Sequence, residues 1–328
     1  MRFVVYGAGA VGGVVGAQLA QKSHSVVLIA RGAHYKALRD HGLRFESPDH
    51  IVHVDLPVFD HPSQIAWQQD DVVLLGMKTQ DTFLALEDLA VVAPPDIPIV
   101  CMQNGVANER MALRRFPRVY GMYVYCAASH LAPGVVQGWF APVRGILDIG
   151  RYPSGADAFC GELASVLQGV HFHSESRVDI MRWKYRKLLM NLGNAVEALC
   201  GDAGRRTPLV DRARREGAEC LTAAGIPYAS DTEDGVLRER KLRLQGIEGQ
   251  HRTGGSTWQS LARQTHSVEA DYLNGEVALL GRLNGINTPV NEVLQRLMKQ
   301  AAVAGKAPGT MSLEDLENLC GSASPRQI

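Results

Sequence analysis

The chain has 328 residues, a length typical of about two domains. Its 34 Lys and Arg residues balance 34 Asp and Glu residues, which excludes a general basic surface for a nucleic-acid backbone. Hydrophobic residues make up 46% and charged residues 21%, a balance that excludes wholesale disorder.

From Arg2 to about Gly150, short apolar runs alternate with segments of helical pattern. The runs lie at 3–6, 26–30, 72–77 and 97–102. Such runs are typical of parallel strands that are buried on both faces. The alternation predicts an α/β fold with a Rossmann-type, doubly wound parallel sheet over residues 1–175. Residues 119–150 have no helical pattern and indicate antiparallel strands beside that sheet.

After about Ser174 the hydrophobic pattern takes a period of 3.6, which predicts an all-α helical domain over residues 176–305. Its long amphipathic helices are expected at 178–200, 208–224, 256–284 and 289–304. The remaining residues, 306–328, form a Gly-, Pro- and Ser-rich tail whose composition is compatible with flexibility. Within this tail, a short helical pattern follows Ser312.

A GxGxxG motif stands between the first predicted strand and the first predicted helix. It consists of Gly7, Ala8, Gly9, Ala10, Val11 and Gly12. In this context the glycines allow a tight turn, close approach of a pyrophosphate and helix packing, while backbone N–H groups favour the anion. We predict dinucleotide binding here. The alternative is a tight turn without a ligand.

The residue after the second strand indicates which dinucleotide binds. NAD-binding domains usually carry Asp or Glu there, whereas this chain has Arg31 and no acid before Asp40. Arginine pairs with a 2′-phosphate in bidentate fashion, so the sequence favours NADP over NAD. The alternative is a surface arginine that begins a helix.

Two further strand ends carry polar residues at the edge where a doubly wound sheet binds ligands. We expect Lys78 to meet the cofactor phosphate or ribose. Gln103 and Asn104 are expected near the cofactor, and Asn104 also near the substrate. Ordinary polar turns are the alternative.

Three polar side chains line one stripe of the expected helix 178–200. At about 100° per residue, Asn191 lies about 40° from Lys187 and Asn194 about 20° on the other side. A partly desolvated lysine has a lowered pKa and gives up its proton near neutral pH. We therefore predict that this stripe faces a substrate. A solvated helix face is the alternative.

Ser256 and Glu269 form a third candidate group. Ser256 is placed as the N-cap of a helix, a role that does not exclude ligand contact. Glu269 on its own would be a solvent-facing acid.

Other classes of catalytic site find no support in the sequence. The six cysteines are far apart without a CxxC pair, and neither HExxH nor GxSxG occurs. We expect no catalytic metal and no serine triad.

The first residues run directly into a strand, without a basic leader, and no apolar stretch reaches the roughly 20 residues that span a bilayer. A soluble, cytoplasmic protein that binds no membrane is therefore expected.

Taken together, these motifs resemble the ketopantoate reductase (2-dehydropantoate 2-reductase) family. The similarity runs over roughly residues 1–305 and keeps the motif order GAGAVG, Arg31, MKTQ, QNG, RKLLMNLGN, STWQ and EADYLNG. It implies a Rossmann domain joined to a helical domain, with hydride transfer from NADPH to the C2 carbonyl of a 2-oxo acid. A homodimer is compatible with the sequence, which does not determine the oligomeric state.

The resemblance also implies roles for individual residues. Lys187 corresponds to the general acid and Glu269 to the acid that binds substrate hydroxyls. Asn104, Asn191 and Ser256 correspond to substrate-contacting positions, and Gly7, Gly9, Gly12, Arg31 and Lys78 to NADPH-binding positions.

The sequence departs from the family pattern around the third group. Ser260 replaces an acid, and an asparagine is absent from 251–254. Because these changes fall on substrate groups, a different branched 2-oxo acid stays open as the substrate. An opine-type dehydrogenase and a non-catalytic NADPH-binding sensor are further alternatives.

Overall fold

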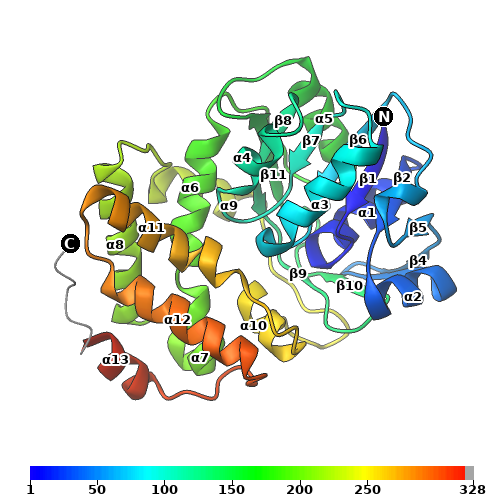
Figure 1. The fold of residues 1–328 in the computed structure, drawn as a ribbon. Coiled ribbons are helices and arrows are strands. Elements are labelled where there is room, and N and C mark those ends of the chain that lie inside the picture. The colour runs from blue at the N-terminus through cyan, green and yellow to red at the C-terminus, as the bar shows by residue number, and fades with distance from the viewer. Residues whose placement is uncertain (322–328) are drawn as a thin grey trace. The chain divides into compact units, whose positions relative to one another are not determined.

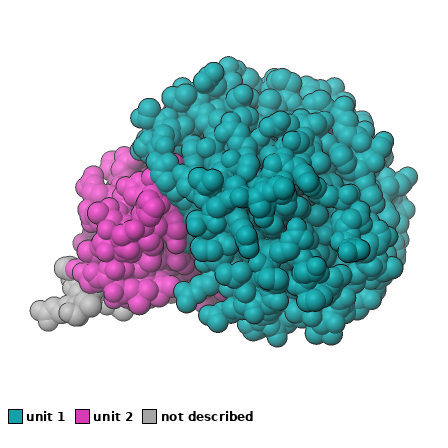
Figure 2. Space-filling model, turned by 90° about the horizontal axis from the view of Figure 1, so that it is seen from above, with its two compact units in different colours: residues 1–184, 230–252 teal, residues 185–229, 253–328 magenta. Residues whose placement is uncertain are grey.

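The computed structural model describes residues 1–321. By its internal contacts the chain divides into two compact units, coloured separately in Figure 2. Unit 1 comprises residues 1–184 and 230–252, and unit 2 comprises residues 185–229 and the chain from Thr253 onward. The two units are thus interleaved along the sequence, whereas the sequence pattern predicts two consecutive domains, 1–175 and 176–305.

Unit 1 is built around a seven-stranded sheet (Figure 1). Its strands are β1 (Arg2–Tyr6), β2 (Ser25–Ile29), β5 (Val58–Phe59), β6 (Asp71–Leu75), β7 (Ile99–Cys101), β8 (Val119–Tyr125) and β11 (Ile146–Arg151). Their order is β11-β8-β7-β6-β1-β2-β5, and every neighbouring pair is parallel except β11 with β8. The predicted doubly wound sheet is confirmed, and its order reverses between β1 and β6.

Helices bury both faces of this sheet, which explains the continuous apolar runs. On β1, Phe3 and Val5 pack into one core and Val4 into another. The first core contains α1 (Ala10–Gln21) and α5 (Ala158–Gly169). The second contains α3 (Thr79–Val92) and α4 (Asn108–Leu113). Because side chains alternate along a strand, a strand between two such layers must be apolar at each position.

A second sheet of four strands completes the first half of unit 1. It is formed by β3 (Leu43–Glu46), β4 (Ile51–Val54), β9 (Ala128–Ser129) and β10 (Val135–Gly138), in the order β4-β3-β10-β9. The antiparallel strands expected over 119–150 are therefore correct only in part. β8 lies in the main sheet, parallel to β7, because its residues 119–124 are all buried as in a central strand.

Unit 2 is helical, as predicted. Its helices are the end of α6 (Ile180–Asn191), α7 (Asn194–Cys200), α8 (Pro208–Ala223), α10 (Ser256–Ala262), α11 (Asn274–Asn284), α12 (Pro289–Val303) and α13 (Leu313–Gly321). The helix α13 confirms the short helix expected after Ser312, and residues 322–328 of the expected tail lie outside the described residues.

Two of the expected long helices are interrupted. The helix expected over 178–200 breaks at Leu192 and Gly193, where a Cβ on Gly193 would lie 2.9 Å from Val210 Cγ1. The glycine thus lets α8 approach, at the cost of helix continuity. The helix expected over 256–284 is divided into α10, a 3₁₀ turn at Glu269–Tyr272 and α11.

One segment from the second half of the chain belongs to unit 1. It begins with α9 (Asp231–Lys241), whose Asp234 carboxylate accepts a hydrogen bond from the Tyr123 hydroxyl of β8. Beyond α9 the backbone pairs with the first half of the unit, where Leu244 forms a β-bridge with Phe140. The sequence pattern did not predict α9, because Val236 and Leu237 are its only large apolar residues.

None of the helices within residues 1–321 combines the length and the apolar character that crossing a membrane requires.

Candidate active site

The glycine-rich loop lies at the point where the strand order of unit 1 reverses. Gly7 has a φ of +101°, and a Cβ on it would lie 2.5 Å from the Met77 backbone nitrogen. A Cβ on Gly12 would lie 2.2 Å from the Gly7 carbonyl oxygen. Both positions therefore require glycine for packing.

Gly9 differs from these two glycines. A Cβ on Gly9 would have nothing within 4 Å, and α1 begins directly after it with no acidic residue in its first turn. Open space beside uncapped helix N–H groups fits a pyrophosphate. Cofactor binding by residues 7–12 stays a prediction that this geometry supports.

His34 holds the glycine-rich loop from the side of α2 (Gly32–His41). Its Nδ1 accepts a hydrogen bond from the Gly134 N–H at 2.9 Å, so the proton of the neutral ring is on Nε2, which lies 2.8 Å from the Ala8 carbonyl oxygen. This contact was missed in the sequence, where nothing but the proximity to Arg31 marks His34.

Arg31 is the N-cap residue of α2, and its side chain is 78% exposed. It forms an ion pair with Asp81 of α3 at 2.7 Å. The alternative of a surface arginine that begins a helix thus describes its position correctly. An exposed guanidinium at the end of β2 is also accessible to a 2′-phosphate, so the cofactor role stays a prediction.

The ends of β6 and β7 are tied together by buried side chains. Gln103 Nε2 donates to the Met77 carbonyl oxygen at 3.0 Å and to Thr82 Oγ1 at 2.7 Å. Thr82 Oγ1 in turn donates to Asn108 Oδ1 at 2.9 Å. These are not ordinary solvated turns, because Gln103, Thr82 and Asn108 are all buried.

Asn104 stands at the open end of this network. Its carbonyl oxygen accepts a hydrogen bond from Asn108 Nδ2 at 3.0 Å. Its own side-chain Oδ1 is buried and accepts no hydrogen bond from the described residues, and the same is true of Gln103 Oε1. Buried acceptors without a partner are costly, and a ligand that donates to them recovers this cost. Lys78, beside them, is the N-cap residue of α3.

A buried lysine on α6 was missed in the sequence. Lys184 Nζ lies 2.6 Å from Glu109 Oε1, and the two side chains are 2% and 0% exposed. The ammonium also donates to the carbonyl oxygens of Gln103 at 2.8 Å and Met122 at 3.4 Å. Burial and then the Glu109 charge raise the pKa of the adjacent Cys101 thiol well above its usual value. No sequence signal distinguished Lys184 from its neighbour Lys187.

Within unit 2, Lys187 and Asn191 lie one turn apart on α6. Lys187 is partly exposed, whereas Asn191 is 6% exposed and its Nδ2 has no hydrogen-bond partner among the described residues. Asn194 begins α7 after the break at Leu192 and Gly193. The 100° projection therefore applies to Lys187 and Asn191 but not to Asn194, and the substrate roles of all three stay predictions.

Ser256 is not an N-cap, contrary to expectation. The N-cap of α10 is Gly255, and Ser256 is the first helical residue. The Gly255 N–H donates to both carboxylate oxygens of Glu197, each at 3.2 Å, and a Cβ on Gly255 would lie 2.7 Å from Glu197 Oε2. Glu197 of α7 thus satisfies the first of the N–H groups at this helix end, and no side chain of the N-cap position takes part.

Glu269 is 5% exposed, so it is not the solvent-facing acid that it would be on its own. It begins the 3₁₀ turn that precedes α11. Its burial distinguishes Glu269 from a surface acid, and its substrate role stays a prediction.

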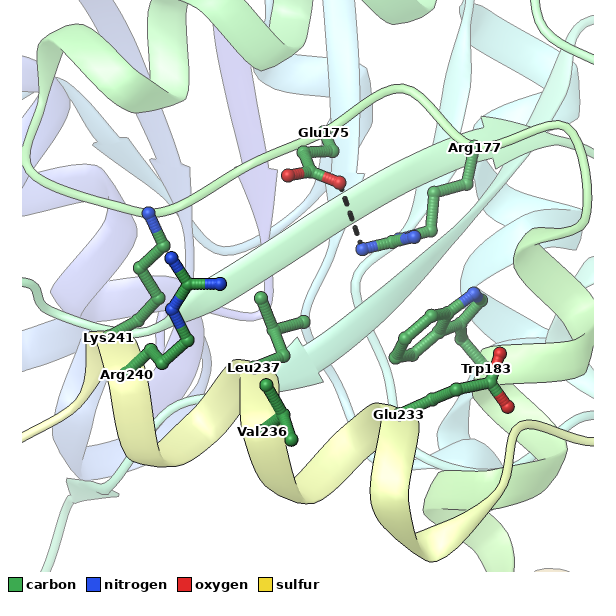
Figure 3. A pocket seen from close by; sticks show the side chains of 8 residues that line it. All are labelled: Glu175, Arg177, Trp183, Glu233, Val236, Leu237, Arg240 and Lys241. Atoms are coloured by element: carbon green, nitrogen blue, oxygen red, sulfur yellow. Dashed lines mark hydrogen bonds and ion pairs between the residues drawn. The ribbon is translucent and has the colours of Figure 1, made fainter.

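A pocket of about 470 Å³ lies elsewhere in unit 1 (Figure 3). It is lined by Glu175, Arg177, Trp183, Glu233, Val236, Leu237, Arg240 and Lys241. None of these is a predicted site residue, and several already bind one another. Arg177 lies 4.0 Å from the Trp183 ring centroid and 3.0 Å from Glu175. We therefore do not assign this pocket to catalysis.

Residues 1–321 contain no cluster of His, Cys, Asp and Glu suited to a metal ion.

Comparisons with known proteins place these features in a family. Residues 3–153 match the model of ketopantoate reductase PanE/ApbA, and residues 179–302 match the model of its C-terminal domain. A 2-dehydropantoate 2-reductase of Pyrococcus horikoshii is 26% identical over 307 residues, covering 91% of this chain and 97% of the relative. One from Halobacterium salinarum is 29% identical, with 92% and 99% covered.

Solved structures show the same fold. A PanE/ApbA family ketopantoate reductase from Ralstonia eutropha has a TM-score of 0.77 and 28% identity, covering 93% of this chain and 99% of the other. D-mandelate dehydrogenase, solved with NADH and anilino(oxo)acetate, has a TM-score of 0.78 at 21% identity with the same coverage. With both family models matched in order over most of its length, the chain belongs to the ketopantoate reductase PanE/ApbA family and is an oxidoreductase of that type.

Proposed function

We propose that the protein reduces a 2-oxo acid to the 2-hydroxy acid with NADPH, and that 2-dehydropantoate is the substrate. The observation that carries this proposal is the match of both halves of the chain to ketopantoate reductases, at residues 3–153 and 179–302. The geometry adds support, because the chain offers an open glycine-rich loop at Gly9 and an exposed Arg31. Asn104 and Asn191 add buried amide atoms that have no hydrogen-bond partner within residues 1–321.

The cofactor would be held by residues of unit 1. The backbone of residues 7–12 would hold the pyrophosphate, and Arg31 the 2′-phosphate. Lys78 would contact a phosphate or ribose, and Gln103 and Asn104 the nicotinamide side. When bound, the nicotinamide supplies a hydride to the C2 carbonyl carbon of the substrate.

The substrate would be held mainly by residues of unit 2. Ser256 would donate a hydrogen bond to the substrate carboxylate, and Glu269 would accept one from a hydroxyl. Asn191 and Asn194 supply further amide groups. As negative charge develops on the carbonyl oxygen, the Lys187 ammonium stabilises it and transfers a proton to it.

A specific observation favours a second candidate, the reduction of another 2-oxo acid. Ser260, which stands where the family pattern has an acid, is buried and donates its hydroxyl to the Ser256 carbonyl oxygen of its own helix. A site that lost an acidic group has lost a partner for substrate hydroxyls. The neighbour D-mandelate dehydrogenase was solved with a 2-oxo acid derivative that has an aromatic group, and with NADH.

The test is a turnover assay with purified protein, NADPH or NADH, and a panel containing 2-dehydropantoate, 2-oxoisovalerate and phenylglyoxylate. Loss of reduced-cofactor absorbance is expected to be fastest with NADPH and 2-dehydropantoate. Faster turnover of another acid would select the second candidate. A requirement for an amine would indicate an opine-type dehydrogenase, and NADPH binding without turnover would indicate a sensor.

Lys187→Ala tests the proton donor. We expect kcat to fall by about 10²- to 10⁴-fold with NADPH binding intact, because general acid catalysis contributes that much. The control is Lys299→Ala, which removes an exposed lysine paired with Asp271. Wild-type turnover by Lys187→Ala would remove Lys187 from the mechanism.

A further inference from the structure

The Lys184 ammonium is a buried charge that the proposed mechanism does not use. It is 2% exposed, and its charge is balanced by Glu109, which is fully buried at 2.6 Å. Exposed lysines and glutamates need no such pairing, and a buried pair of this kind adds little net stability compared with apolar residues of similar size. Its presence therefore calls for another reason.

The backbone of β8 makes room for this ion pair. A Cβ on Gly121 would lie 3.3 Å from Lys184 Cδ and 3.5 Å from Glu109 Oε1. Gly121 lies in the buried strand β8 between two large residues, Tyr120 and Met122, which are each 1% exposed. A small residue at position 121 thus accommodates the aliphatic part of Lys184 where it passes β8.

Lys184 holds one particular peptide group. Its Nζ donates to the carbonyl oxygen of Gln103 at 2.8 Å. That oxygen and the N–H of Asn104 belong to the same planar peptide unit, so the hydrogen bond sets the plane from which Asn104 begins. On its other side, the Asn104 carbonyl oxygen accepts from Asn108 Nδ2 at 3.0 Å, and Gly105 continues the chain with a φ of +79°.

The main chain of Asn104 is therefore held on both sides, while its side-chain Oδ1 is buried without a partner among the described residues. An acceptor that is fixed in place and unpaired is suited to a ligand donor. We propose that Lys184, paired with Glu109, is a positioning residue that orients the Gln103–Asn104 peptide and thereby the Asn104 amide for the nicotinamide and substrate. This inference rests on the proposed function.

The test separates positioning from stability by removing both charges together. Lys184→Met alone leaves a buried, uncompensated carboxylate and is expected to destabilise the fold. The double variant Lys184→Met/Glu109→Leu removes the pair and is expected to recover most of the lost stability. It cannot restore the hydrogen bond to the Gln103 carbonyl oxygen.

For the double variant we expect kcat to fall by about tenfold to a hundredfold, with KM for NADPH changed by less than about twofold, because small misplacements of site groups are costly. The matched control, Arg182→Met, removes a surface ion pair between α6 and Glu233 and should leave kcat unchanged. A double variant with wild-type stability and wild-type kcat would overturn the proposal.

A second measurement does not depend on activity. Hydrogen exchange of the segment 103–108 should be faster in the double variant than in the wild type at equal global stability. Unchanged exchange there would overturn the positioning role, even if the wild type turned over none of the 2-oxo acids and the proposed function itself failed.

Discussion

The guanidinium group of Arg31 lies 2.7 Å from the carboxylate of Asp81, 50 residues further along the chain. An acid is thus present at the end of β2 after all, but it comes from α3. Exposed ion pairs of this kind contribute at most about 1 kcal/mol, so a phosphate can displace Asp81 from Arg31 at low cost.

Arg31→Ala should lower kcat/KM for NADPH by about tenfold or more and leave kcat/KM for NADH unchanged, since a charge-assisted hydrogen bond contributes about 1.5–3 kcal/mol. Arg39→Ala, which removes another exposed arginine of α2, serves as the control. Steady-state kinetics with both cofactors measure the ratio. If the ratio of kcat/KM for NADPH to kcat/KM for NADH is the same in the wild type, Arg31→Ala and Arg39→Ala, Arg31 does not select the cofactor.

Asp81→Asn should have the opposite effect on the same ratio. The substitution removes the carboxylate that competes with a 2′-phosphate for Arg31, so the preference for NADPH should increase. A fall in NADPH affinity, measured by cofactor fluorescence, would instead show that Asp81 holds Arg31 in the binding conformation.

Asn191→Leu should separate stability from activity. The buried Nδ2 of Asn191 has no partner among residues 1–321, and an unsatisfied buried donor costs about 1–3 kcal/mol. We expect the melting temperature to stay the same or rise while KM for the 2-oxo acid rises by about tenfold or more. A clear loss of stability would show that Asn191 has a structural role.

Asn291→Leu provides the contrast for that experiment. Asn291 is fully buried, and its Nδ2 donates to the Ala213 carbonyl oxygen at 2.9 Å and to Glu216 at 2.8 Å. Because leucine would remove both of these buried hydrogen bonds, this variant should lose about 2 kcal/mol or more in the free energy of unfolding.

Glu216 of α8 caps the N-terminus of α12. Its two carboxylate oxygens accept the N–H groups of Val290 and Asn291, each at 3.0 Å. Burial raises the pKa of Glu216, and these hydrogen bonds oppose that shift. Glu216→Ala should lower the free energy of unfolding by about 1–3 kcal/mol, because buried helix N–H groups lose their acceptors. Denaturant unfolding measures this change, and Glu219→Ala, an exposed residue of the same helix, should be neutral.

The raised pKa values of the buried cysteine thiols predict that their alkylation depends on pH. Burial raises the pKa of Cys160, Cys200 and Cys220 to about 11, so at pH 8 only about one in a thousand of each is thiolate. These thiols should resist iodoacetamide in the native protein, and partly exposed Cys126 should react first. Reactivity should increase as the pH rises toward 11. Peptide mass spectrometry would contradict this if native and unfolded proteins reacted equally at pH 8.

Much of the fold of unit 1 could be predicted because its strands are buried on both faces. A continuous apolar run such as Val26–Ala30 has few other uses in a globular chain. The break at Gly193 could not be predicted, because it depends on the approach of Val210, a contact between segments distant in sequence. For the same reason α9 was missed, since its stability depends on partners such as Tyr123 rather than on its own apolar pattern.

In the candidate site, too, residues set by a local motif could be predicted and residues set by distant contacts could not. Gly7 and Gly12 were identified because the GxGxxG motif places both in one short segment, where the positive φ of Gly7 and the contact of Gly12 with the Gly7 carbonyl oxygen require glycine. Lys184 was missed because burial, and not residue type, distinguishes it from Lys187, and a sequence does not show which of two lysines on one helix meets a carboxylate such as Glu109.

The return of residues 230–252 to unit 1 has a consequence for protein synthesis. A ribosome that has released residue 184 has supplied every strand of the large sheet, yet Tyr123 still lacks Asp234 and Phe140 still lacks Leu244. The nascent first half of unit 1 must therefore wait until residues 185–252 have also been synthesised before its last contacts can form. No single cut of the gene separates the two units into complete pieces.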